Sequence, residues 1–175
     1  MTTHRAVHVP AAQGSLELVD VETSSPPPGH VRIAVQACGV CGTDREFVAG
    51  HFPGMSWPLT PGHEIAGTIA EIGSGVEGFA VGDRVAVGWF GGNCNHCGQC
   101  RKGQFIHCEN GQVPSWQYPG GYAQSVTAPA TALARIPEAL SFVDAAPMSC
   151  AGVTVYHALR STHAMAGDRV AVLGV

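Results

Sequence analysis

The chain is poor in charge and has no surplus of basic residues. Asp, Glu, Lys and Arg make up only 13% of its 175 residues, and the formal net charge is −4. Proteins that bind nucleic acid usually carry an excess of Lys and Arg that neutralises phosphates. We therefore expect no nucleic-acid partner. The hydrophobic fraction of 45% is instead typical of a globular protein that buries one core.

Long apolar runs are also missing. No segment approaches the roughly 20 apolar residues of a membrane span, and the opening MTTHRAVHVPAAQ contains no apolar core of signal-peptide length. These absences predict a cytoplasmic protein with no membrane partner. In a reducing compartment the seven cysteines favour thiolate ligation of a metal over disulfides.

Short β-type runs separated by Gly and Pro fill the chain from residue 5 to about residue 135. They are RAVHV, LELVDV, HVRIAVQA, IAGTIAEIG, DRVAVGW, YAQSVTAP and LARIP. This alternation predicts a mainly β fold, a small barrel, with some α-helix. After Pro137 the spacing becomes helical, with Ser141 as N-cap and Pro147 expected to break the helix in two. The final AGDRVAVLGV predicts an apolar strand.

The clearest motif is a run of four closely spaced cysteines. They are Cys94, Cys97, Cys100 and Cys108, in GGNCNHCGQCRKGQFIHCEN. Two-residue spacers let successive thiolates point at one tetrahedral Zn²⁺, and four protein ligands leave no position for a substrate. The motif therefore predicts a structural zinc that fixes a loop poor in apolar residues. His96 and His107 are near enough to leave a Cys3His set as an alternative.

A second candidate metal site is sparser. Its members are Cys41 in GVCGTD, His63 in PGHEIAG and Cys150 in MSCAGVTVY. Each lies at the end of a predicted strand or in a helical turn, beside small residues. Three ligands and one labile oxygen would make zinc a Lewis acid. Any chain with a histidine and two cysteines allows such a grouping on paper, so spacing alone leaves it a hypothesis.

Neighbouring residues could serve this second site. Glu64 could orient the ligands or occupy the open position, and Asp44 could accept the second ring N–H of His63. Thr43 offers a hydroxyl that could pass on a proton. A surface acid and an ordinary turn threonine are the plainer interpretations of Glu64 and Thr43. Cys38 forms a C-x-x-C with Cys41 that could be redox-active, but a small buried residue at a strand end explains it equally.

Together these motifs resemble the zinc-dependent alcohol dehydrogenases of the medium-chain dehydrogenase/reductase superfamily. GVCGTD, PGHEIAGTIAEIGSGV, VGDRVAV, the cysteine run, GGYAQ and CAGVTVY occur in the family's order. The resemblance implies a GroES-like β-barrel catalytic domain at residues 1–140, with a structural zinc lobe at 91–111. A helical connection at 141–166 would carry the third catalytic ligand. Residues 167–175 would be the first strand of a truncated Rossmann domain.

The resemblance also implies roles for individual residues. Two zinc ions per chain would be held, a catalytic one by Cys41, His63 and Cys150 near Glu64, and a structural one by the four-cysteine run. Thr43 would relay the proton, and hydride would pass between a small alcohol or aldehyde and NAD or NADP. Thr154 and Gly174 would bind the cofactor. Trp57, Trp89 and Phe90 would line the substrate pocket.

Three departures from the family pattern leave alternatives open. Glu46 stands where many members have a relay histidine, and CGTDRE also resembles sugar and polyol dehydrogenases. Most of the nucleotide-binding half is missing, so we expect this chain alone to be inactive. It could pair with a complementing nucleotide-binding half, form a homo-oligomer, or be a zinc-binding interaction module without catalysis.

Overall fold

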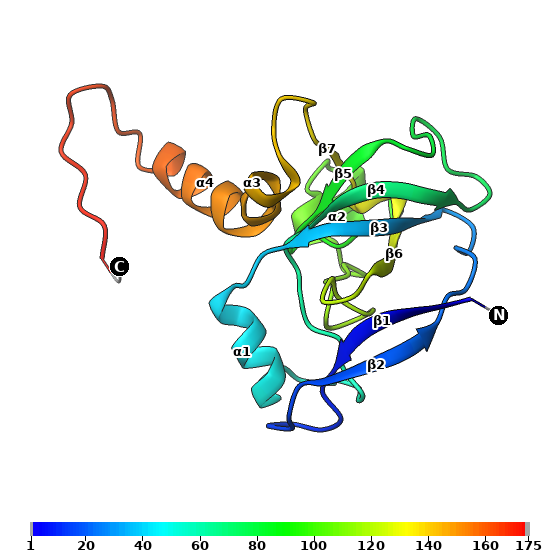
Figure 1. Ribbon diagram of the computed structural model, residues 1–175. Helices are drawn as coiled ribbons and strands as arrows, with labels where there is room; N and C mark the ends of the chain where they lie inside the picture. Colours follow the sequence, from blue (N-terminus) through cyan, green and yellow to red (C-terminus); the bar gives the residue numbers. More distant parts are fainter. Residues whose placement is uncertain (1, 174–175) are drawn as a thin grey trace.

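The computed structural model describes residues 2–173 and consists of a β-barrel with a helical arm (Figure 1). Its main sheet has five antiparallel strands in the order β6-β3-β4-β5-β7. These strands are β3 (His30–Cys38), β4 (Ile65–Ile72), β5 (Arg84–Val87), β6 (Ser125–Pro129) and β7 (Ala134–Arg135). A two-stranded ribbon, β1 (Thr3–His8) and β2 (Glu17–Glu22), joins the barrel through a bridge between Ala6 and Ala123. The predicted mainly β fold is confirmed.

The barrel core comes from alternate residues of the strands. Ile33 of β3 pairs with Ile69 of β4 on one side and with Val126 of β6 on the other. All three side chains are buried, together with Val31 and Val85. Because side chains alternate between the two faces of a strand, the apolar periodicity read from the sequence turns one face of the sheet inward.

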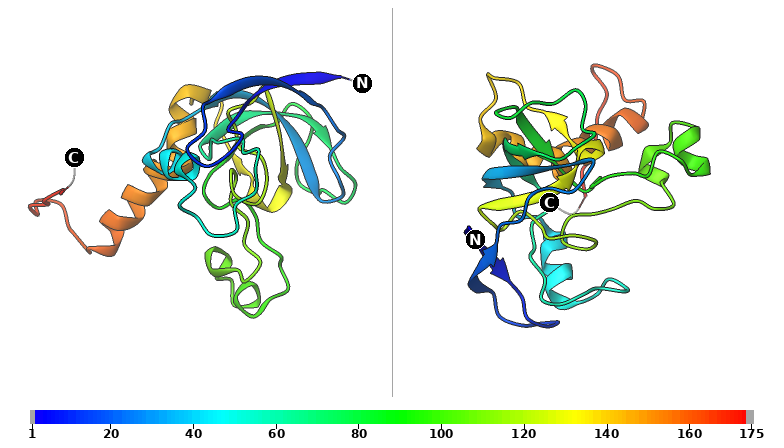
Figure 2. Two further views of the ribbon diagram at one scale, coloured as in Figure 1. Left: turned by 90° about the horizontal axis from the view of Figure 1, so that it is seen from below. Right: turned by 90° about the vertical axis from the view of Figure 1, so that its right-hand side faces the viewer.

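Short helices connect the strands and build the lobe. Helix α1 (Gly42–Ala49) follows β3 and ends at Gly50, whose φ of 80° is left-handed and suits glycine. Helix α2 (Gly98–Arg101) and a 3₁₀ turn at Phe105–His107 lie in the lobe of residues 91–111, which protrudes from the barrel (green in Figure 2). A further 3₁₀ turn, Ala130–Ala132, precedes β7.

The helical arm begins as predicted but does not break at Pro147. Ser141 caps α3 (Phe142–Pro147), because its hydroxyl accepts the N–H of Asp144 at 3.1 Å. The prediction of a break at Pro147 is wrong. Its φ of −67° fits a helix, and the chain continues through a π-helical turn, Met148–Gly152, into α4 (Val153–Ser161). Proline lacks an N–H and therefore costs the helix one hydrogen bond, but the chain stays helical beyond Pro147.

The strand predicted at the C-terminal end is not observed in the described part of the chain. Residues 167–173 contain no strand and run away from the barrel (Figure 1). A strand needs a neighbour to bond its N–H and C=O groups, and this segment has none in residues 2–173. The prediction for Gly174 lies outside the described residues.

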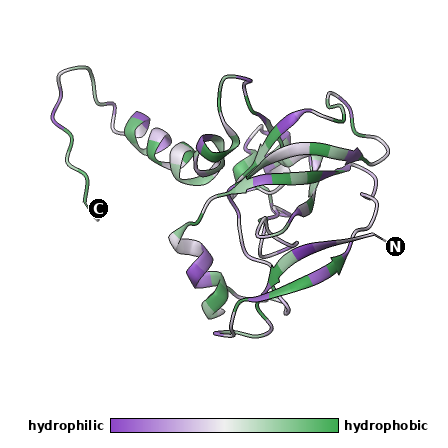
Figure 3. Ribbon diagram, in the orientation of Figure 1, coloured by the Kyte–Doolittle hydropathy of each residue, from purple (hydrophilic) through white to green (hydrophobic). Residues whose placement is uncertain are grey.

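Apolar side chains are exposed along the arm. On α4 the side chains of Val155, Tyr156 and Leu159 are at least half exposed, and Figure 3 shows apolar residues on this helix. Helix α3, by contrast, buries Ala145 and Ala146 against the barrel. Within residues 2–173, no helix has both the length and the apolar character required to cross a bilayer.

We predict that Ile33→Ala lowers the free energy of unfolding by about 2–5 kcal/mol, since it opens a cavity between three strands. Urea denaturation at fixed zinc concentration measures the change. Val81→Ala is the control, because Val81 is 64% exposed, and its effect should stay within about 0.5 kcal/mol. Equal losses in the two variants would contradict the core assignment.

Candidate metal centres

Cys41 and His63 are brought together by Asp44. Cys41 is the N-cap of α1, and its backbone N–H donates to Oδ2 of Asp44 at 2.9 Å. His63 directly precedes β4, and its Nδ1 lies 3.0 Å from Oδ1 of the same carboxylate. Both His63 and Asp44 are buried. The predicted contact between His63 and Asp44 is confirmed.

The other ring nitrogen of His63 is buried without a partner. Asp44 holds the proton on Nδ1, which leaves a lone pair on Nε2, and this atom has no hydrogen-bond partner in the described part of the chain. Leaving a buried polar atom unsatisfied costs on the order of 1–3 kcal/mol. One ring nitrogen of His63 lies within 4.8 Å of ligand atoms from Cys41, Glu64 and Cys150, and because Nδ1 is bonded to Asp44 we assign Nε2 as the ligand atom. A metal bonded to Nε2 would remove this cost, so the residues fit a metal.

Cys150 reaches this group from the π-helical turn. The turn packs tightly on the end of β5, because a Cβ on Gly88 would lie 1.8 Å from the carbonyl oxygen of Ser149. The Ser149 hydroxyl bonds to the carbonyl of Val87 at 3.3 Å. Glycine at position 88 therefore permits the backbone approach that places Cys150 opposite Cys41 and His63.

Glu64 is not a surface acid. Its side chain is 2% exposed, and its Oε1 accepts the backbone N–H of Ala151, the residue after Cys150, at 3.4 Å. The plainer interpretation of Glu64 is therefore wrong. Its carboxylate belongs to the converging group, where it could occupy the fourth position around a metal.

The electrostatics of the group favour a cation. Burial, together with the nearby charges of Cys41 and Glu64, raises the pKa of Cys150 to about 12. Burial opposes ionisation of Asp44, but hydrogen bonds from His63 and from the Cys41 N–H outweigh it and lower the Asp44 pKa. Several acidic groups thus share one buried space, and a divalent cation there would stabilise their ionised forms.

Thr43 and Cys38 lie beside Cys41 but differ in environment. The Thr43 hydroxyl is 3.8 Å from the Cys41 sulfur, so it adjoins the candidate site. Burial raises the pKa of the Cys38 thiol to about 12, which disfavours the thiolate that redox exchange requires. Cys38 therefore behaves as the small buried residue rather than as half of a redox pair.

An aromatic cluster covers one side of the His63 ring. Trp89 meets His63 edge to face with ring centroids 5.7 Å apart, and Phe47 lies 6.0 Å from His63. Trp57 packs behind them. Phe90 and Trp89 line a cavity of about 120 Å³ toward the cysteine lobe. Trp89 is the one of the three predicted pocket residues whose ring packs against the His63 ring in the described part of the chain.

Sequence reasoning missed some neighbours of the site. Phe47 is three residues after Asp44 on α1, and helical periodicity would have placed the two on one face. Histidines outside the site also have partners: Nδ1 of His51 lies 2.6 Å from the Glu46 carboxylate. Likewise, His4 bonds to Thr23 and His30 to the carbonyl of Pro28. Thr154, the predicted nicotinamide neighbour, lies exposed on α4.

The four cysteines of the lobe converge with sulfur spacings that suit zinc. Cys108 Sγ lies 3.6 Å from Cys94 Sγ and 3.9 Å from Cys97 Sγ. A tetrahedron with Zn–S bonds of roughly 2.3 Å has edges of about 3.8 Å. The converging group contains neither His96 nor His107, so the structure favours four cysteines over the Cys3His set.

The lobe lacks an apolar core. From residue 93 to residue 111 only Cys97 and Cys100 are buried, while Phe105 and Ile106 are 45% and 65% exposed. Hydrogen bonds to the sulfur of Cys94 favour its thiolate. The side chain of Asn110 makes the largest contribution and the backbone N–H of His96 the next, and the pKa of Cys94 is lowered to about 5. A segment with so little apolar burial needs a cross-link to keep its fold. A metal held by the four cysteines would supply one.

Comparison with known proteins assigns the family. The model of the alcohol dehydrogenase GroES-like domain matches residues 27–138. The chain belongs to this family. An alcohol dehydrogenase of Geobacillus stearothermophilus is 43% identical over 161 residues, which is 91% of this chain and 48% of that protein. The chain spans about half the length of the curated relatives it matches.

Solved structures of dehydrogenases share the fold. A cobalt- and zinc-bound thermostable alcohol dehydrogenase from Pyrobaculum aerophilum matches with a TM-score of 0.83 at 32% identity, covering 92% of this chain and 49% of that one. The D-arabinose dehydrogenase of Sulfolobus solfataricus matches with a TM-score of 0.80 at 30% identity, covering 93% and 49%. The GroES-like barrel expected from the motifs is therefore confirmed.

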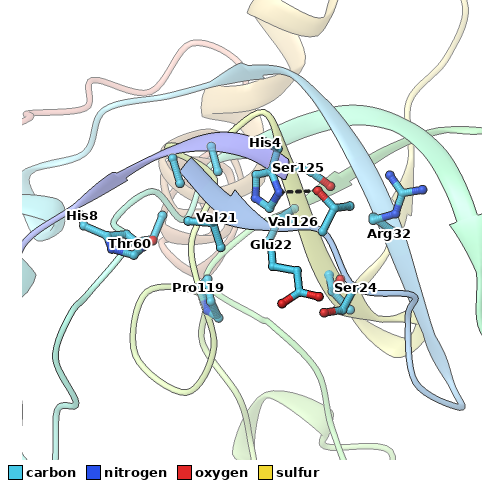
Figure 4. A pocket seen from close by; sticks show the side chains of 14 residues that line it. His4, His8, Val21, Glu22, Ser24, Arg32, Thr60, Pro119, Ser125 and Val126 are labelled. Carbon is cyan, nitrogen blue, oxygen red and sulfur yellow. Dashed lines mark hydrogen bonds between the residues drawn. The ribbon is translucent and has the colours of Figure 1, made fainter. Parts of the chain in front are cut away.

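A separate pocket lies away from both cysteine groups. It has a volume of about 220 Å³ and lies between the β1–β2 ribbon and β6, where His4 bonds to Thr23 (Figure 4). Arg32 lines it but is paired with Glu71 at 2.9 Å. None of the residues of the GroES-like domain that were predicted to bind metal, cofactor or substrate lines this pocket.

We predict that His63→Ala removes one equivalent of bound metal and leaves the metal of the lobe in place, because only the Cys41 group loses a ligand. Plasma mass spectrometry of protein purified without added zinc gives the count. His51→Ala is the matched control, since its ring is largely exposed and lies outside both groups. Retention of all bound metal by His63→Ala would contradict the site.

We predict that Cys97→Ser lowers the melting temperature and the yield of soluble protein, because it breaks the cross-link of a lobe without a core. Differential scanning calorimetry measures the change. The control is Cys38→Ala, which removes a cysteine outside both groups and should leave the metal content unchanged. A Cys97→Ser variant as stable as the parent would refute a structural metal in the lobe.

Proposed function

We propose that the chain is the catalytic domain of a zinc-dependent alcohol dehydrogenase that interconverts an alcohol with an aldehyde or ketone, using NAD or NADP. The observation that carries the proposal is the buried Nε2 of His63, which has no partner in the described residues, in a residue that forms one group with Cys41, Cys150 and Glu64. Family membership and relatives named as alcohol dehydrogenases support it. We also propose a cytoplasmic location, where cysteines stay reduced and can bind zinc.

In this proposal each residue of the group has a distinct task. Cys41, His63 and Cys150 hold the catalytic metal, and Glu64 occupies the remaining position until a substrate enters. Zinc held there would supply Lewis acidity toward a substrate alcohol, and a bound nicotinamide would supply the hydride acceptor. Asp44 keeps the His63 proton on Nδ1, so that Nε2 stays available.

The surroundings of the group serve proton transfer and the exclusion of water. Thr43 places a hydroxyl beside Cys41, where it accepts the proton of the alcohol and passes it outward. Trp89 and Phe47 shield one side of His63, and an apolar wall of this kind keeps water from the hydride acceptor. Trp57 and Phe90 extend this wall in the proposal.

The exposed apolar side chains of α4 form a surface that a nucleotide-binding domain could cover. Val153, Val155, Tyr156 and Leu159 are each at least half exposed, and apolar patches of this kind mark interaction sites. We assign this face to a nucleotide-binding domain, carried by the same polypeptide or by a complementing one, and place Thr154 beside the nicotinamide. Without that domain the chain should not turn over.

The substrate could also be a sugar or polyol. The similarity to the D-arabinose dehydrogenase of Sulfolobus solfataricus and the CGTDRE segment favour this second candidate. A zinc module without catalysis is the further alternative. The fourth member of this group is a carboxylate, Glu64, which a substrate oxygen could replace, whereas the lobe group consists of four cysteines; this difference argues for the enzyme.

We predict that a small alcohol binds to the metal of the Cys41 group in the isolated chain. Cobalt is substituted for zinc, and trifluoroethanol, an alcohol of low pKa, is added while the visible d–d bands are recorded. The bands should shift in the parent and stay unchanged in His63→Ala, which retains only the lobe metal. Unchanged bands in the parent, with both sites loaded, would favour the non-catalytic module.

A further inference from the structure

Hydrogen-bond donors surround the sulfur atoms of the lobe. Backbone N–H groups approach Cys108 and Cys97: those of Cys94 and Asn110 point at Cys108 Sγ, each at 3.4 Å, and that of Cys100 points at Cys97 Sγ at 3.5 Å. The contacts from Asn110 and Cys100 follow from tight loops in which an amide turns toward a preceding sulfur, whereas the contact from Cys94 joins the two ends of the motif.

Side-chain amides serve the other two sulfurs. Asn110 Nδ2 donates to Cys94 Sγ at 3.5 Å, and Asn93 Nδ2 lies 3.6 Å from Cys100 Sγ. Asn110 therefore contacts two ligands at once, with its backbone N–H on Cys108 and its side chain on Cys94. These two sulfurs are 3.6 Å apart. One residue thus bridges an edge of the ligand tetrahedron.

The charge of the site gives these donors a purpose. Zn²⁺ with four thiolates has a formal charge of −2, and the lobe around it has little apolar cover. Arg101 and Lys102 are exposed on the lobe, and no Arg or Lys in residues 2–173 is hydrogen-bonded to a lobe sulfur. The negative charge on the four sulfurs is therefore stabilised by neutral N–H groups that donate hydrogen bonds to them.

We propose that Asn110 and Asn93 are positioning residues for the lobe zinc, each holding through its side-chain amide a thiolate that would otherwise be less well oriented and more readily lost from the metal. Partners of metal ligands typically contribute 10–100-fold to metal affinity. Asn110 also donates its backbone N–H to Cys108, a contact that a side-chain substitution leaves in place. Asn93 acts on Cys100 and is itself held by Asn95 at 2.6 Å and by Thr131, whose hydroxyl accepts its backbone N–H.

This inference rests on the proposed function, since it requires zinc in the lobe. The test is made in the His63→Ala background, so that only the lobe metal is counted; Cys150→Ser replaces His63→Ala if that variant is insoluble. Release of zinc to a chromogenic chelator is followed in the background protein, in Asn110→Asp, whose side chain cannot donate to Cys94, and in Asn110→Ala, which removes the side-chain amide without adding charge.

Asn110→Asp should release zinc roughly 10–100-fold faster than the background protein, with Asn110→Ala in between. The control is Gln104→Glu, which makes the same change of charge in the same lobe at an exposed amide that has no hydrogen bond to a lobe sulfur in residues 2–173. Its release rate should match that of the background protein. Equal rates in Gln104→Glu and Asn110→Asp would show that only net charge matters and overturn the proposal.

A spectroscopic readout separates positioning from folding. With cobalt in the lobe, Asn110→Ala should move the sulfur-to-metal charge-transfer band to lower energy, because the sulfur lone pairs lose a hydrogen bond. A lowered melting temperature with an unmoved band would mean a merely structural role and would overturn the proposal. Failure of the background protein to bind any metal would instead refute the structural zinc on which the proposal depends.

Discussion

The candidate active site depends on one buried carboxylate. Asp44 accepts four hydrogen bonds, from the N–H groups of Cys41 and Gly62, from the His63 ring and from the Tyr122 hydroxyl. These donors come from the start of α1, from the loop before β4 and from the segment before β6. A buried carboxylate is stable only with such partners, so the same contacts that solvate Asp44 also set the positions of two candidate ligands.

The two metal groups are held by different means. In the Cys41 group the barrel itself positions the ligands, because His63 adjoins β4 and the turn carrying Cys150 packs on Gly88 at the end of β5. The lobe has no such scaffold, and its cysteines are arranged by local turns and by amide donors. Loss of metal should therefore leave the first group largely preformed, whereas the lobe depends on the metal for its order.

The fold and the four cysteines of the lobe could be predicted from the sequence because their signals are local. Alternation of apolar and polar residues predicts the strands, and the C-x2-C-x2-C spacing predicts which sulfurs lie close enough to bind one metal. The grouping of Cys41, His63 and Cys150 needed the family resemblance, because their separation carries no geometric information. The sulfur contacts of Asn93 and Asn110 depend on rotamers of lobe residues. The π-helical turn at Met148–Gly152 depends on how the arm packs against β5, which no periodicity reveals. In residues 167–173 a local signal was not sufficient. Their composition favours a strand, but no neighbouring strand in the described residues is present to pair with them.

The position of Cys150 has a mechanical consequence. Two candidate ligands, Cys41 and His63, belong to the barrel side, whereas the third lies on the arm that leads to α4. A metal bound by all three residues would cross-link the barrel to the arm. Any hinge rotation of the arm would stretch or compress the ligand triangle, so the coordination geometry would act as a gauge of the angle between the two parts.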